Sequence, residues 1–360
     1  MTFRLSGLRG AKRIRTALLA AGLIITQSGC VNNGPSTEVS RGEDYLLNTY
    51  CTLTIYEPDR EDVIREAFQF ARTLENLLSR TVADSEIAAV NRSSAGEAVS
   101  VSRETAHVVE RGLYYSALSG GLFDITLGAL TELWDFSSLA PRVPAREEID
   151  RAVSTAGYHT IGMVSNADGG GAVITKEISD THLDLGGIAK GYIADRVKEF
   201  LELRGISAAL INFGGNVVIL GDKADGTPWL IGVEKPFSAE EEGDPVRELC
   251  GEIAVTRGSV VTSGIYERKF TENGQTYHHI LDPETGYPRE TDLISVTVTG
   301  PASTDCDALS TICLMLGMDK GWALMESLAS YEAVFIPKEG TIAVTPGARF
   351  TSYGEWEGAQ

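Results

Sequence analysis

The chain has 360 residues, 43% of them hydrophobic, which is enough to build a large core in one big domain or in two closely packed ones. Its formal net charge is −19. Because a nucleic-acid partner needs clustered lysine and arginine on the protein surface, this charge argues against such a partner, although a metal ion still allows small anions to bind locally.

The first 29 residues have the pattern of an export signal. A basic segment is followed by a short apolar run at 16–26, and Ser28 and Gly29 then lead into Cys30. This resembles a bacterial lipoprotein signal, in which Cys30 is the lipidated first residue of the mature protein. An ordinary cleaved secretory signal is the alternative, because Gln27 stands where a lipobox usually has leucine. We therefore expect the protein in the bacterial periplasm, anchored to a membrane by lipid, with the inner membrane favoured.

Residues 30–43 are polar and are predicted to form a flexible tether, so the folded domain is expected to span 44–355. Alternating hydrophobicity predicts a strand at 50–56, and an apolar face at helical spacing predicts a helix at 58–78. A polar loop is expected at 79–91. It precedes a helix that begins near Arg103 and ends at Gly120 and Gly121.

The rest of the chain is dominated by predicted strands. Strand-like runs lie at 172–175, 207–212, 216–220, 228–234, 251–256 and 259–263, and, after a loop at 271–288, at 294–298, 332–337, 341–345 and 349–353. Helices are predicted at about 304–316 and 319–328, and the acidic segment 236–248 is predicted to be a surface loop. Because the strands between 207 and 263 follow one another without helices, we expect mainly antiparallel sheet flanked by helices, which is the α+β class.

Four cysteines lie beyond the signal, at Cys51, Cys250, Cys306 and Cys313. None has C-x-x-C spacing, so a zinc site is not expected. Each lies among apolar residues, which favours a buried free thiol over a disulfide.

The segment THLDLGGIAKGY, at 181–192, is the strongest single candidate for ligand binding. Asp184, a glycine pair and Lys190 stand at the start of a predicted helix that ends at Gly205. Exposed amides at a helix start favour an anion, and a lysine adds a point charge for a phosphate. The alternative is that the glycines only make a tight turn and Lys190 is solvated. Neither the Rossmann nor the P-loop glycine pattern is present.

A second cluster lies at 119–136, where Gly120 and Gly121 are followed by Phe123 and Asp124. An aromatic ring and a carboxylate at this turn suit a planar heteroaromatic ligand. A glycine helix stop with a core phenylalanine explains the same residues without a ligand.

A third cluster lies at 262–288 and contains His278 and His279 side by side. Adjacent residues of a strand face opposite ways, so only one of the two histidines can face a site. Ser263, Tyr266 and Asp282 nearby favour a functional role. A structural or solvated histidine is the alternative.

Asp307 and Thr311 are four residues apart in a predicted helix and therefore share one of its faces. A carboxylate and a hydroxyl in this arrangement suit one hard cation such as Mg²⁺. The alternative is that Asp307 only compensates the helix dipole, an effect of about 0.3–1 kcal/mol.

These clusters occur together, in order and with matching spacings. From about 44 to 355 the chain resembles the ApbE family of flavin transferases, also called FAD:protein FMN transferases. The resemblance is carried by LSRTVADSEIAAVNR at 78–92, GGLFDITLG at 120–128, LDLGGIAKGYIAD at 183–195, INFGGNVV at 211–218, TSGIYER at 262–268, HHILDPETGYP at 278–288 and DALSTICLMLG at 307–317. Seven ordered motifs are far more specific than one glycine-rich loop. They imply an ApbE-like, T-fold-like architecture.

The resemblance also implies an activity and a site. It implies Mg²⁺-dependent cleavage of the FAD pyrophosphate, with FMN attached through a phosphoester to a threonine of a periplasmic partner protein and AMP released. The metal ligands would be the Gly187 carbonyl, Asp307 and Thr311, with Asp307 and His279 as the catalytic residues and His279 as general base. The candidate FAD-binding positions are Leu47, Thr81, Leu122, Phe123, Asp124, Asp184, Lys190, Ser263 and His279.

One position departs from the family pattern. Many members have a tyrosine that lies against the flavin where this chain has Thr81, so the flavin is less covered there and water has more room. FAD pyrophosphatase activity, which yields FMN and AMP, is therefore the alternative or companion activity. A lipid-anchored flavin-binding protein without turnover is the third interpretation. Metal ligands and a base argue against it, because storage needs neither.

Overall fold

The computed structural model describes residues 38–237, 248–356 and 358. The expected signal, Cys30 and most of the expected tether lie outside this part of the chain. The first strand begins at Ser40, so residues 40–43, which we expected in the tether, belong to the folded domain. Within the described ranges, no helix combines the length and the apolar character that a membrane span requires.

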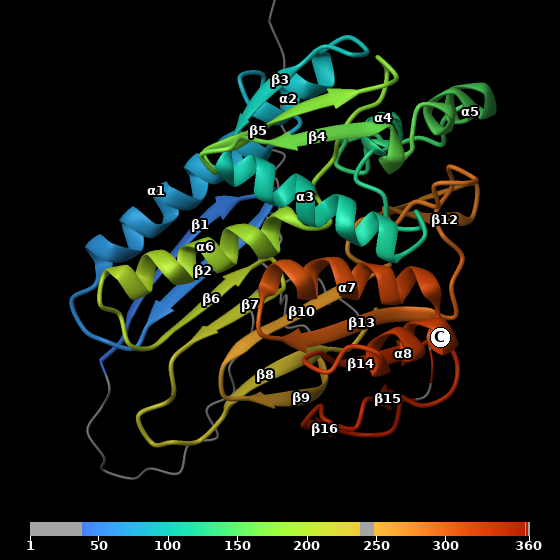
Figure 1. Ribbon diagram of the computed structural model, residues 1–360. Helices are drawn as coiled ribbons and strands as arrows, with labels where there is room; N and C mark the ends of the chain where they lie inside the picture. The colour runs from blue at the N-terminus through green and yellow to red at the C-terminus, as the bar shows by residue number, and fades with distance from the viewer. Residues whose placement is uncertain (1–37, 238–247, 357, 359–360) are drawn as a thin grey trace, which may run out of the picture.

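The core of the fold is one eight-stranded sheet whose neighbouring strands are all antiparallel (Figure 1). In spatial order the strands are β1 (Ser40–Leu46), β2 (Thr49–Ile55), β6 (Ala209–Phe213), β7 (Asn216–Leu220), β10 (Gly258–Gly264), β13 (Leu293–Gly300), β14 (Glu332–Pro337) and β15 (Ala343–Val344). The predicted α+β class with mainly antiparallel sheet is confirmed.

Both faces of this sheet are covered. One face packs against helices in the largest hydrophobic cluster, and the other packs against a small sheet in a second cluster. Alternate residues of β7 show this, because Val218 and Leu220 belong to the first cluster and Val217 and Ile219 belong to the second. The helices on the sheet are α1 (Glu61–Leu78), α6 (Ala189–Leu203), α7 (Ser303–Leu316) and α8 (Met318–Glu326), and α3 (Arg103–Leu118) lies over α6 and α7 (Figure 1). The small sheet contains β8 (Trp229–Glu234), β9 (Leu249–Val255) and β16 (Phe350–Ser352).

Additional elements lie on the outer side of α3, where a three-stranded sheet runs alongside it, and beyond the right-hand ends of α3 and α7 (Figure 1). They are the three-stranded sheet of β3 (Val99–Ser102), β5 (Gly171–Lys176) and β4 (Ile161–Ser165), the helices α2 (Glu86–Arg92), α4 (Gly128–Trp134) and α5 (Arg146–Ser154), the 3₁₀ turn Tyr158–Thr160, and the hairpin of β11 (Lys269–Glu272) and β12 (Gln275–His278). The hairpin packs on α4 because Trp134 has ring contacts with Phe270 and Tyr277.

Two predicted loops contain regular structure. The expected polar loop at 79–91 includes the start of α2, because the hydroxyl of Ser85 accepts the amide of Ala88 at 2.8 Å and caps a helix that buries Ile87 and Val90. The expected loop at 271–288 includes β12. Short elements at 99–102, 128–134, 146–154 and 161–165 were not predicted.

The four described cysteines are free thiols, as the sequence predicted. Cys51, Cys306 and Cys313 are buried, whereas Cys250 is partly exposed, so burial was predicted wrongly for that residue. Burial raises the pKa of Cys51 to about 12. Burial also raises the pKa of Cys250, Cys306 and Cys313, which disfavours the reactive thiolate form of these cysteines at neutral pH.

Candidate functional site

The segment that leads into α6 is fixed by two polar side chains. Lys176 is 1% exposed, and its ammonium donates to the carbonyls of Asn91 (2.7 Å), Ser179 (2.7 Å) and Thr181 (2.9 Å). The amide side chain of Asn91 accepts from the backbone N–H of Leu183 at 2.7 Å and donates to its carbonyl at 3.0 Å. Apart from one isolated bridge between Leu127 and His182, this segment forms no strand and is held by Asn91.

Asp184 joins three parts of the chain. Its Oδ2 accepts from Arg80 Nε at 3.1 Å and from the Thr131 hydroxyl at 2.7 Å, and its Oδ1 accepts from the amide of Gly186 at 2.8 Å. About a fifth of the side chain remains exposed, so the carboxylate is positioned by the fold and still accessible.

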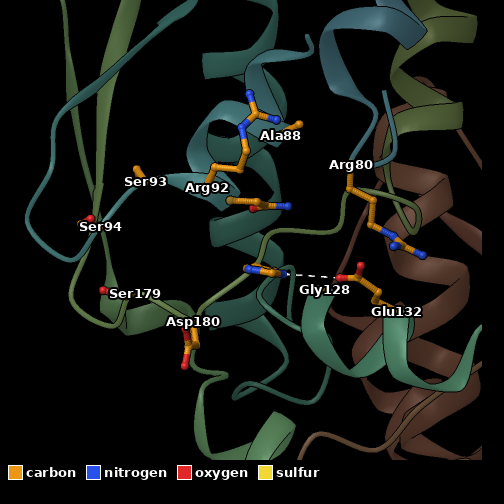
Figure 2. Close-up of a pocket in the computed structure, with 11 residues that line it drawn as sticks. Arg80, Ala88, Arg92, Ser93, Ser94, Gly128, Glu132, Ser179 and Asp180 are labelled. Atoms are coloured by element: carbon orange, nitrogen blue, oxygen red, sulfur yellow. Dashed lines mark ion pairs between the residues drawn. The ribbon is translucent and has the colours of Figure 1, made fainter. Parts of the chain in front are cut away.

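A polar hollow of about 440 Å³ adjoins this carboxylate, because Arg80 lines the hollow and also bonds Asp184 (Figure 2). Arg92 projects from α2 on another side, and Glu132 on α4 forms an ion pair with His182 at 3.6 Å. Charged side chains of both signs line the hollow, which suits a polar ligand.

Asp307 meets the start of α6. It is 2% exposed, its Oδ2 accepts from the backbone N–H of Gly191 at 2.9 Å, and its Oδ1 lies 3.2 Å from the ammonium of Lys190. The sequence offered dipole compensation of its own helix as an alternative, but Asp307 satisfies the amide of a different helix. An anion is therefore already present where the sequence predicted an open phosphate cradle.

The reverse contact comes from Asp195 on α6. Its carboxylate accepts from the amides of Ser303 (2.9 Å) and Thr304 (2.8 Å) and from the Thr304 hydroxyl (2.7 Å) at the start of α7. Burial raises its pKa, and these donors oppose that rise. The two helices thus cap each other, a feature that no local sequence pattern indicated.

Gly191 permits this close helix contact. A Cβ built at this position would lie 2.3 Å from the carbonyl oxygen of Ser303. We expect Gly191→Ala to lower the free energy of unfolding by about 1–3 kcal/mol, because the helices must separate. Urea denaturation measures this change, and Gly354→Ala, which meets nothing within 4 Å, is the control. Equal stability of the two variants would contradict the prediction.

Thr311 and Ser263 lie beside Asp307. The Thr311 hydroxyl is 3.3 Å from the backbone carbonyl of Asp307 and 3.0 Å from the hydroxyl of Ser263, which also lies 2.8 Å from the hydroxyl of Ser310. The end of β10 and one face of α7 therefore bring three hydroxyls together.

Gly187 and Phe123 are in contact across the same region. A Cβ on Gly187 would lie 2.8 Å from Cε2 of the Phe123 ring. Any larger residue at position 187 would therefore displace this ring. Phe123 is 6% exposed and belongs to the hydrophobic core. Leu122 beside it is partly buried and packs against that core.

The glycine turn after α3 is a Schellman helix stop. The amide of Gly121 donates to the carbonyl of Ser116 at 2.7 Å, and that of Gly120 donates to Ala117 at 3.0 Å. Asp124 accepts from the amide and hydroxyl of Thr126 and from the amide of Tyr158 at 2.7–2.9 Å. Burial raises its pKa, and these donors counter that rise. The structural interpretation of this cluster is thus correct, and its contact with FAD stays a prediction.

Leu47 and Thr81 lie on turns. Leu47 occupies the β1–β2 turn with φ 56°, a left-handed conformation that is costly for leucine, and its amide donates to the carboxylate of Glu75 at 2.7 Å. Thr81 is exposed, and its hydroxyl lies 3.0 Å from that of Ser79. Flavin contact at both positions stays a prediction.

His278 and His279 both have lowered pKa values, and different neighbouring charges contribute to each. Burial lowers the pKa of His279 to about 3, and the charges of Arg268 and Lys190 act in the same direction. Burial and Lys338 lower the pKa of His278 to about 4. Among the described residues, the Nδ1 atom of each ring is buried without a hydrogen-bond partner. Both rings are therefore neutral at pH 7.

These lowered pKa values predict acid sensitivity. The unfolded chain protonates its histidines near pH 6.5, whereas the folded chain does so near pH 3–4, so the unfolded state binds more protons between these values. The stability is complete above pH 6.5 and falls as the pH drops from there toward 4. Thermal melting against pH should show a smaller decline for His279→Gln. An identical decline would contradict the assignment.

Asn216 lies in the 211–218 motif, but the sequence did not indicate it as a candidate site residue. It is 1% exposed, and among the described residues neither its side-chain oxygen nor its nitrogen has a partner. It stands opposite Val261 on β10, two residues before Ser263. A buried amide without partners is costly and calls for a ligand or water. The only signal in the sequence was a polar residue opening an otherwise apolar strand.

Comparison with known proteins identifies the class to which this fold and site belong. The sequence profile of the ApbE family matches residues 47–335, so the chain belongs to the ApbE family. A Treponema pallidum protein named FAD:protein FMN transferase is 32% identical over 88% of this chain and 90% of its own length. A Klebsiella pneumoniae protein of the same name is 33% identical over 84% and 91%.

A solved structure supports the same assignment. The crystal structure of the ApbE protein from Thermotoga maritima has a TM-score of 0.75 and 30% identity, covering 86% of this chain and 97% of that one. The predicted ApbE-like architecture is therefore confirmed.

Proposed function

We propose that this protein is a Mg²⁺-dependent FAD:protein FMN transferase that moves FMN from FAD to a threonine of a partner protein and releases AMP. The observation that best supports this proposal is the contact of the buried Asp307 carboxylate with Lys190 and with the amide of Gly191. The relatives of this chain are named FAD:protein FMN transferase. A carboxylate and an ammonium beside a helix start are the groups that pyrophosphate chemistry needs.

The chemistry of the proposed ligands fits a hard cation. The described residues contain no group of three or more His, Cys, Asp or Glu side chains, but the proposed donors are one carboxylate, one hydroxyl and one carbonyl, from Asp307, Thr311 and Gly187. An all-oxygen set is the kind that Mg²⁺ prefers, and it leaves positions for substrate oxygens. Bound Mg²⁺ supplies neutralisation of the pyrophosphate charge.

Two side chains have the remaining roles in the proposed reaction. Lys190 attracts the phosphates, and neutral His279 accepts the proton of the acceptor hydroxyl. The threonine oxygen forms a bond to the phosphorus of the FMN half. The bond from that phosphorus to the oxygen it shares with the AMP half breaks, and its electron pair leaves with AMP.

Hydrolysis of FAD to FMN and AMP is the second candidate. It is supported by Thr81, whose short side chain is hydrogen-bonded to Ser79 where many relatives have a tyrosine against the flavin. Water that enters there replaces the threonine hydroxyl as the nucleophile.

One assay separates these activities. The protein is incubated with FAD and Mg²⁺, with and without a purified domain that contains a D-[GSA]-[ST]-[SA]-x-[ST] segment. Covalent FMN on that domain supports the transferase, free FMN with AMP supports the hydrolase, and intact bound FAD identifies a carrier. Omitting Mg²⁺ should abolish both reactions.

We also propose that Cys30 carries a lipid that anchors the protein to a membrane in the periplasm. The basic and apolar pattern before Cys30 supports this. Cys30→Ala should move the protein from the membrane fraction to the soluble fraction. Unchanged fractionation would contradict the anchor.

A further inference from the structure

A groove of about 950 Å³ lies along β12, whose last residue, His278, precedes His279 in the chain. All four residues of β12 line it, and residues 287–292 line it from another direction. Tyr287 and Arg289 still pair with 280–282 just beyond β12: the amide of Asp282 donates to the Tyr287 carbonyl, and the amide of Arg289 donates to the Ile280 carbonyl, both at 2.8 Å. Residues 287–289 thus run beside residues 280–282. The groove begins where this pairing stops and residues 290–292 separate from β12.

The backbone of β12 has an unpaired edge on this side. β12 pairs with β11 through an Asn273–Gly274 turn, and the two strands form a sheet of their own within the described residues. In such a hairpin, alternate residues bond inward, and the amide of His279 does so with the Arg268 carbonyl at 3.1 Å. The alternate residues Thr276 and His278 therefore direct their N–H and C=O groups outward.

The groove also contains positive charge in a chain of net charge −19. Lys269 and Lys338 line it, and the Lys269 ammonium lies 4.3 Å from the centre of the Phe237 ring. Arg289 is paired with Asp282 at 2.5 Å, and Asp292 accepts from the amide of Met318 at 3.1 Å. Glu290 also lines the groove and is exposed, but Lys269 and Lys338 outnumber it, so the lining favours an occupant with acidic side chains.

We propose that this groove binds the flavin-receiving segment of the acceptor protein as an added strand on the outer edge of β12. The inference rests on the transferase activity proposed above. Main-chain hydrogen bonds to Thr276 and His278 supply affinity with little dependence on sequence, and the lysines favour an acidic residue in the segment. The bound strand leads to the end of β12, where His279 follows in the chain.

Thr276→Pro tests the edge directly. Proline removes the outward N–H of Thr276, which makes no bond to β11, so the hairpin tolerates it. The matched control is Thr271→Pro, since Thr271 is the cross-strand partner and faces the opposite edge. With the purified domain containing the D-[GSA]-[ST]-[SA]-x-[ST] segment as probe, we expect Thr276→Pro to raise the acceptor KM at least about tenfold and Thr271→Pro to leave it unchanged. FAD affinity reports that each variant is folded.

Hydrogen–deuterium exchange of the unaltered protein gives an independent measurement. Adding the probe domain should slow exchange at Thr276 and His278 but not at Thr271. Transfer with an unchanged acceptor KM in Thr276→Pro, or no added protection of β12, would overturn the docking proposal while the transferase stands. Protection that appears without the probe, as the protein's own concentration rises, would assign the edge to a second copy instead. Absence of any FMN transfer by the unaltered protein would overturn the transferase itself.

Discussion

Asp307→Asn is expected to lower the Mg²⁺-dependent release of AMP from FAD by at least about 10²-fold. The substitution keeps the shape of the side chain but removes the only carboxylate among the proposed metal ligands, and with it several kcal/mol of charge stabilisation. It also weakens the charged hydrogen bond to Gly191, so the free energy of unfolding should fall by about 1–3 kcal/mol. AMP release against Mg²⁺ concentration measures the first effect, and urea denaturation measures the second.

Asp305→Asn is the matched control. Asp305 lies on the same helix but pairs with Arg111 and the Tyr331 hydroxyl, both at 2.6 Å, away from the proposed metal ligands. This variant should lose stability and keep its AMP release. Full activity in Asp307→Asn at every Mg²⁺ concentration would remove Asp307 from the mechanism.

His279→Ala is expected to lower FMN transfer by about 10²–10⁴-fold while FAD still binds. This range is the usual contribution of a general base, and His279 is neutral at pH 7, which is the form that a base requires. Single-turnover transfer measures the chemical step, and FAD titration measures the binding. Added imidazole should restore part of the rate in His279→Gly.

His107→Gln controls for the loss of a histidine elsewhere. His107 is exposed on α3, where its ring lies near Tyr192. Its replacement should leave transfer unchanged. A His279→Ala protein that transfers FMN at the normal rate between about pH 6 and pH 9 would show that another group takes the proton.

The sequence predicted those parts of the fold that depend on local pattern. Helical spacing placed α1 and α7, and period-two hydrophobicity placed β2 and β13. Apolar strand-like runs placed β6, β7, β10 and β14, and the absence of helices between 207 and 263 indicated antiparallel pairing. Short elements such as α2 were missed because seven residues with three buried side chains give too weak a periodic signal.

The candidate site was predicted as a set of residues and not as an arrangement. Spacing put Asp307 and Thr311 on one helix face, but the contact of Asp307 with Gly191 joins residues 116 positions apart, which no window of sequence can reveal. The same reason hid the buried ammonium of Lys176 and the pairing of Asn91 with Leu183. Long-range packing decides these contacts.

The mutual capping of α6 and α7 has a consequence for the order of synthesis. The ribosome completes α6 long before Asp307 is made, because the two partners are 116 residues apart. A nascent chain that ends before Ser303 lacks the carboxylate that caps α6 and two of the three proposed metal ligands. The enzyme therefore lacks its proposed metal site until residues 303–311 have been made and have packed on α6.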